Sequence, residues 1–130
     1  MTTSTRREPE VADKVLINLA TGMEDGERVL VAFLVATAAV EQGKEVVVWT
    51  TKDAVCLGLP GEMQGVVCEG CPPLERLLSQ FVDGGGRLWL CPICLNARGL
   101  QDAEKLEGVT VAGATPMWEW AGADTTVFSY

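Results

Sequence analysis

Apolar residues occur along the chain in short runs that are separated by polar and glycine-rich segments. Five of these runs have the length and the apolar or β-branched character of strands, at residues 14–20, 44–51, 88–90, 109–112 and 125–129. Continuous apolar runs of this length are typical of strands buried on both faces of a parallel sheet. The segments between them are mostly helical, and this alternation favours right-handed crossovers. We therefore expect an α/β protein with three α/β/α layers around a mainly parallel five-stranded sheet.

The longest predicted helix, at residues 27–42, is apolar on every face. Its apolar stretch, residues 29–40, is too short to cross a bilayer, because a membrane-spanning helix needs about 20 residues. A helix that is apolar all round has to be covered on two sides. We expect the sheet to cover one side and another subunit to cover the other. Asp25 is the expected N-cap of this helix.

The other helical segments are shorter. The helix that follows Pro72 carries apolar residues at 3.6-residue spacing and stops at a glycine triplet. Residues 53–59 form a predicted short turn or helix, and residues 95–106 a helix interrupted around Gly99. Pro116 lies in the first turn of the last helix.

Composition and charge limit what the chain can do. Residues 1–13 are polar and without periodicity, so we expect a mobile tail before a single domain at 14–130. Ten basic and eighteen acidic residues give a net charge of −8. This charge disfavours direct binding to nucleic acid or to an anionic membrane, because phosphate contacts need clustered Lys and Arg. We also expect no nucleotide cofactor, because no Gly-x-Gly-x-x-Gly or Walker-type loop follows the first strand.

Cysteines are the best reactive groups in the sequence. The chain has no histidine, which excludes Ser-His and Cys-His nucleophilic catalysis and His-based zinc hydrolysis within it. It has five cysteines, an odd number, and the N-terminus does not resemble a secretory signal. These features argue for a reducing cytosol and against a disulfide scaffold. We therefore predict a cytoplasmic location.

The segment Cys91-Pro92-Ile93-Cys94 directly follows a predicted buried strand. Pro92 suits the first turn of a helix, where a missing N–H is tolerated. The free N–H groups and the positive dipole end of that helix favour a thiolate. The carboxyl ends of parallel strands are also where catalytic groups gather in open α/β sheets. A cysteine after a strand is often a core residue, but two thiols flanking a helix-start proline are typical of thiol chemistry and of zinc sites. We predict Cys91 as the nucleophile, with Cys94 one turn away as the second catalytic candidate.

Three features of residues 14–130 resemble the DsrE/DsrF-like (TusD/YchN-like) sulfur-transfer family. They are the strand that ends at Cys91 with Gly99 of an Ala-Arg-Gly turn eight residues later, Gly113 with Ala114, and the closing stretch 123–130. The resemblance implies a homotrimer or a homohexamer. It also implies that Cys91 takes sulfane sulfur from a donor, holds it as a persulfide and passes it to an acceptor. Donor and acceptor would be proteins or small sulfane-sulfur compounds, and no cofactor is needed.

The additional thiols leave two alternatives open, because a sulfur carrier requires only one cysteine. Cys91 and Cys94 are also the attacking and resolving thiols expected of a dithiol redox protein. Cys68 and Cys71, followed after nineteen residues by the second pair, have spacing suited to a four-thiolate zinc site of structural or regulatory role. Arg98 is a candidate for supporting the thiolate, although an arginine on a helix surface is the commoner outcome.

Overall fold

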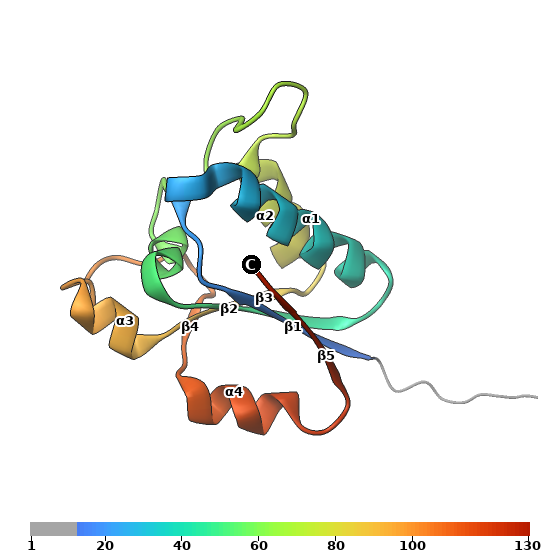
Figure 1. Ribbon diagram of the computed structural model, residues 1–130, viewed down its shortest axis with the longest axis vertical. Helices are drawn as coiled ribbons and strands as arrows, with labels where there is room; N and C mark the ends of the chain where they lie inside the picture. Colours follow the sequence, from blue (N-terminus) through green and yellow to red (C-terminus); the bar gives the residue numbers. More distant parts are fainter. Residues whose placement is uncertain (1–12) are drawn as a thin grey trace, which may run out of the picture.

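The sheet of the protein is five-stranded and entirely parallel, as seen in a computed structural model that describes residues 13–130 (Figure 1). In chain order its strands are β1 (Lys14–Leu19), β2 (Glu45–Thr50), β3 (Arg87–Leu90), β4 (Thr110–Val111) and β5 (Thr125–Ser129). Their order across the sheet is β4-β3-β2-β1-β5. The predicted α/β class with five parallel strands is confirmed.

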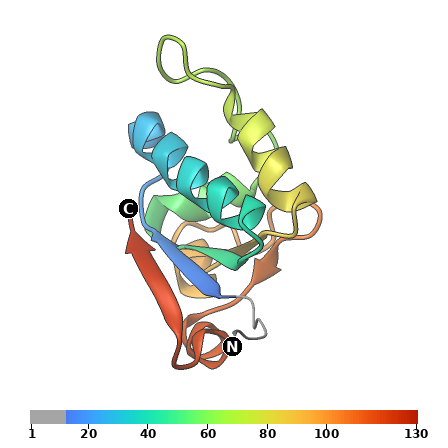
Figure 2. The same cartoon turned by 90° about the vertical axis from the view of Figure 1, so that its right-hand side faces the viewer.

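Four α-helices and two 3₁₀ helices connect the strands. They are η1 (Met23–Asp25), α1 (Gly26–Glu41), η2 (Lys52–Gly58), α2 (Leu74–Asp83), α3 (Pro92–Ala97) and α4 (Ala114–Ala121). Helices α1 and α2 lie side by side over one face of the sheet, and α4 lies under the other face (Figure 1, Figure 2). The short helices η2 and α3 gather beyond the carboxyl ends of β2 and β3 (Figure 1).

The two faces of the sheet bury unequal cores. The larger core lies between the sheet and the α1–α2 layer, where Phe33 and Phe81 meet edge to face with ring centroids 5.6 Å apart. The buried cluster on the α4 face is smaller, and its members are Leu16, Val47, Trp89 and Ala112. The α1–α2 layer therefore holds most of the apolar side chains that stabilise the fold.

Helix α1 begins and ends one residue earlier than predicted. The Asp25 side chain accepts a hydrogen bond from the Arg28 amide at 3.1 Å, which confirms Asp25 as the N-cap. Side chains facing the sheet and α2 are fully buried. On the outer side, Val31 and Leu34 remain 40% and 43% exposed. The second cover expected for this helix is therefore not supplied by residues 13–130 of the same chain.

Two predicted elements are shorter in the structure. Helix α3 ends at Ala97 instead of continuing toward residue 106, because Gly99 takes a positive φ of 66° and turns the chain out of the helix. Strand β4 has two residues instead of four, since it pairs with β3 over only two positions at the edge of the sheet.

Of the tail predicted at residues 1–13, only Asp13 lies within the described residues. Its carboxylate contacts the Lys44 ammonium group at 3.1 Å, just ahead of β1. Within residues 13–130, no helix is both long enough and apolar enough to cross a membrane.

Candidate functional site

The Cys-Pro-x-Cys segment lies at the junction between β3 and α3, as the sequence predicts. Cys91 is the N-cap residue of α3, and Pro92 occupies the first helical turn. The Cys91 amide donates to the Thr50 carbonyl at 3.1 Å, which extends the β2–β3 ladder by one residue. This bond fixes the start of α3 to the carboxyl end of the central strands.

The two thiols of this segment have different surroundings. Cys91 is 8% exposed, and its side chain packs in the larger core. Cys94 is partly exposed, and its Sγ accepts a hydrogen bond from the Lys52 amide at 3.1 Å. An N–H donor aimed at a sulfur stabilises negative charge on that sulfur. Cys94 is therefore the more exposed of the two cysteines, and its sulfur accepts an N–H hydrogen bond.

Helix η2 forms one wall of the site and contacts α3. Asp53 accepts a hydrogen bond from Arg98 Nε at 2.8 Å, while Arg98 Nη1 donates to the Cys94 carbonyl at 3.2 Å. The hydrogen bond to Asp53 holds the pKa of Arg98 above its usual value, and the nearby Cys94 and Cys56 sulfurs act in the same direction. The guanidinium group is thus fixed between η2 and the last turn of α3.

Lys52, which begins η2, has an unusual backbone conformation. Its φ of 53° is the only positive φ of a non-glycine residue in the described part of the chain. Such left-handed conformations are disfavoured for residues with a Cβ and recur at functional sites. The backbone amide of this same residue, Lys52, donates the hydrogen bond to Cys94 Sγ.

A third cysteine, Cys56, belongs to the same edge of the sheet and was missed in the sequence. It lies on η2, and burial raises the pKa of the Cys56 thiol, with the carboxylates of Glu62 and Asp53 adding to the effect and Arg98 opposing it. The thiol form of Cys56 is therefore favoured at neutral pH. The available signal was its place after the second strand, because every such loop lies at the carboxyl edge of a parallel sheet.

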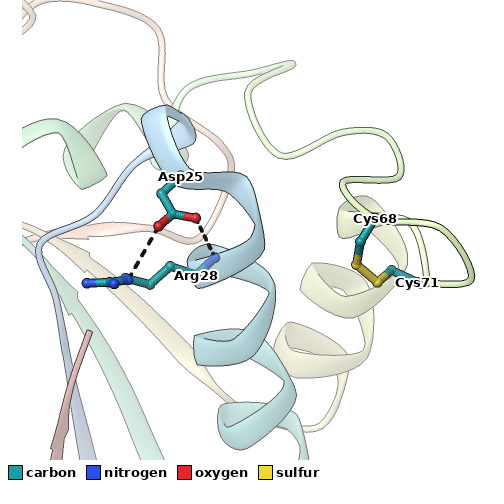
Figure 3. Close-up of a disulfide and its surroundings, with 4 residues drawn as sticks. All are labelled: Asp25, Arg28, Cys68 and Cys71. Atoms are coloured by element: carbon teal, nitrogen blue, oxygen red, sulfur yellow. Dashed lines mark hydrogen bonds and ion pairs between the residues drawn. A yellow bond between two sulfur atoms is a disulfide. The ribbon is translucent and has the colours of Figure 1, made fainter.

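Cys68 and Cys71 form a disulfide in the loop that precedes α2, with their Cα atoms 5.3 Å apart (Figure 3). A disulfide was not expected from the sequence, although this one links residues only three apart and is no scaffold between distant segments. Among residues 13–130, no three His, Cys, Asp or Glu side chains are arranged to hold a metal ion. The zinc site considered for Cys68, Cys71, Cys91 and Cys94 is therefore not formed in this structure.

Comparisons with known proteins identify the family to which this chain belongs and solved structures that share its fold. The family model of the DsrE/DsrF-like family matches residues 13–130. An uncharacterized protein of Methanopyrus kandleri is 29% identical over 121 residues, which cover 92% of this chain and 97% of that protein. An uncharacterized protein of Methanocaldococcus jannaschii is 26% identical over 102 residues. That match covers 78% of this chain but only 37% of the relative.

Two solved structures are similar in fold. The ychN protein from E. coli superposes with a TM-score of 0.75 at 20% identity, over 92% of this chain and 100% of that one. A conserved protein of unknown function from Bacteroides thetaiotaomicron has a TM-score of 0.64 at 16% identity, over 91% of this chain and 95% of that one. Likenesses at these identities concern the arrangement of the helices and strands.

Proposed function

We propose that this chain, which belongs to the DsrE/DsrF-like family, is a sulfur carrier whose Cys91–Cys94 dithiol holds sulfane sulfur as a persulfide. The observation that carries the proposal is the Cys94 sulfur, partly exposed and 3.1 Å from the Lys52 amide, one helical turn from a second free thiol. The sequence predicts Cys91 as the carrier. Both thiols of the pair belong to the proposed site.

Persulfide transfer suits the groups that are present. A thiolate attacks the outer sulfur of a donor persulfide, the donor's S–S bond breaks, and the donor leaves as a thiolate. This reaction needs no general base and no cofactor. It needs an accessible sulfur, and Cys94 offers a partly exposed one that accepts a hydrogen bond from the Lys52 amide, while Arg98 binds the carbonyl of the same residue. The donor and the acceptor are proteins or small sulfane-sulfur compounds.

Assembly into a homotrimer or a homohexamer is part of the proposal. It is supported by the outer side of α1, where Val31 and Leu34 stay exposed in the single chain. Exposed apolar side chains that recur on one side of a helix are typical of contacts between subunits. The cytoplasmic location predicted from the sequence is retained as part of this proposal.

Intact-mass spectrometry of the purified protein after reduction and exposure to inorganic polysulfide tests the proposed function. We expect an added mass of one sulfur that a thiol reductant removes. A loss of two hydrogens that fragment mass spectrometry locates at Cys91 and Cys94, with no persulfide at any time point, would instead favour the dithiol redox alternative, and no change at either cysteine would contradict both.

A further inference from the structure

We infer that Cys94, rather than Cys91, is the thiol that first accepts sulfur, and that Cys91 is the resolving thiol which discharges it. This inference rests on the proposed function and assigns roles within its thiol pair. It reverses the order predicted from the sequence, where Cys91 is the nucleophile.

Accessibility is the first argument. Cys91 is 8% exposed and packs among core side chains, so its sulfur is largely closed to a donor persulfide. A persulfide on Cys91 would also require space for an additional sulfur atom inside a close-packed region, where added volume is destabilising. Cys94 packs against the same core but is only partly buried, so its restriction is smaller.

The distribution of charge around the thiols is the second argument. The Lys52 amide donates to Cys94 Sγ at 3.1 Å, and Arg98, anchored by Asp53, binds the carbonyl of the same residue. The Cys91 side chain makes no capping hydrogen bond. Burial and nearby carboxylates raise the pKa of the Cys56 thiol, which disfavours its reactive thiolate form. Of the three free cysteines, Cys94 is the one whose sulfur accepts an N–H hydrogen bond.

The position of Cys91 makes it suited to the second step. Cys91 is the N-cap residue of α3, and Cys94 follows it after about one helical turn. Attack by the Cys91 thiolate on the inner sulfur of the Cys94 persulfide forms a Cys91–Cys94 disulfide and breaks the bond to the outer sulfur, which leaves as hydrosulfide. The two cysteines are oxidised and the outer sulfur is reduced. A low-molecular-weight thiol then restores the dithiol.

Loading kinetics in single variants test the assignment. Wild type, Cys94→Ser and Cys91→Ala are reduced, exposed to inorganic polysulfide and quenched by alkylation, and the sulfur is located by fragment mass spectrometry. We expect Cys94→Ser to load more slowly by at least about tenfold, because it lacks the more exposed sulfur of the pair. Cys91→Ala should carry its sulfur on Cys94, hold that persulfide longer than wild type does and release no hydrosulfide by the internal route. Cys91→Ser is the second variant if the alanine variant does not fold.

Arg98 provides a separate test, as a positioning residue. Arg98→Gln should slow alkylation of Cys94 by iodoacetamide a few-fold relative to wild type. Arg98→Lys should restore only part of the rate, because it keeps a positive charge near Cys94 but not both hydrogen bonds of the guanidinium group. A merely structural role for Arg98 would leave the alkylation rate of a folded variant unchanged.

The outcomes separate this inference from the proposed function. If wild type loads sulfur and Cys94→Ser loads at the same rate with the sulfur on Cys91, the assignment is wrong and the carrier function stands. If wild type acquires no sulfur at either cysteine, both are wrong.

Discussion

A difference of three positions at the start of one helix separates a buried thiol from a partly exposed one. Cys91 turns into the core because it is the last residue of the β3 ladder, whereas Cys94 faces η2 and the Lys52 amide. The burial of Cys91 and the contact of Cys94 with η2 do not depend on the chemistry of cysteine. Both follow from where a strand ends and which segment packs against the first helical turn.

Glu75 gives a residue-scale prediction about pH. A hydrogen bond from its own amide, and a second one from the Gly65 amide at 2.8 Å, lower the pKa of Glu75 below its usual 4.5. Because the folded value is depressed, the charged carboxylate stabilises the fold above pH 4.5, and the stabilisation is lost as the pH falls through the folded value. Urea unfolding of wild type and Glu75→Gln at several pH values measures it. The difference in unfolding free energy should shrink between about pH 7 and about pH 3. A difference that is constant with pH would contradict the assignment.

At the scale of elements, the alternation of apolar runs was enough to predict the α/β class, the parallel strands and the five-stranded sheet. Periodicity reports which residues are buried against a sheet, and this information is local. The site was predicted only in part. Cys56, Lys52 and the Asp53–Arg98 pair come together because η2 packs on α3, a contact between segments about 40 residues apart that leaves no periodic signal. The Cys68–Cys71 disulfide was missed because an odd number of cysteines says nothing about a local pair.

The contact between η1 and η2 leads to an element-scale prediction. A Cβ built on Gly22, the N-cap of η1, would lie 2.7 Å from the Asp53 carbonyl oxygen, and a backbone atom cannot easily move away. Gly22→Ala should therefore destabilise the protein by about 1–3 kcal/mol, the usual range for overpacking, and slow sulfur loading by displacing Asp53. Thermal unfolding measures the first effect.

Gly113→Ala is the matched control. Gly113 is also an extended N-cap glycine, but a Cβ there would meet its nearest atom, in Pro92, at an ordinary 3.6 Å. We expect this variant to unfold close to wild type. Equal destabilisation by the two substitutions would show that the close approach to Asp53 is not what excludes a side chain at Gly22.

For the whole molecule, the exposed side of α1 predicts association. Val31→Glu should shift the assembly toward monomers, because a buried carboxylate between subunits is strongly unfavourable. Light scattering coupled to gel filtration measures the mass of the assembly. Val82→Glu on α2, where the wild-type valine is 47% exposed, is the control and should leave the mass unchanged. A wild-type monomer at micromolar concentration would contradict the proposed assembly.

The central claim is that the Cys91–Cys94 pair carries transferable sulfane sulfur. Sulfane sulfur that cyanide converts to thiocyanate can be counted per chain, after polysulfide loading and removal of excess reagent. We expect about one transferable sulfur per chain in Cys91→Ala, where the internal route to a disulfide is closed, less in wild type and in Cys68→Ala/Cys71→Ala, and almost none in Cys91→Ala/Cys94→Ser. Undiminished thiocyanate from the Cys91→Ala/Cys94→Ser variant would contradict the claim.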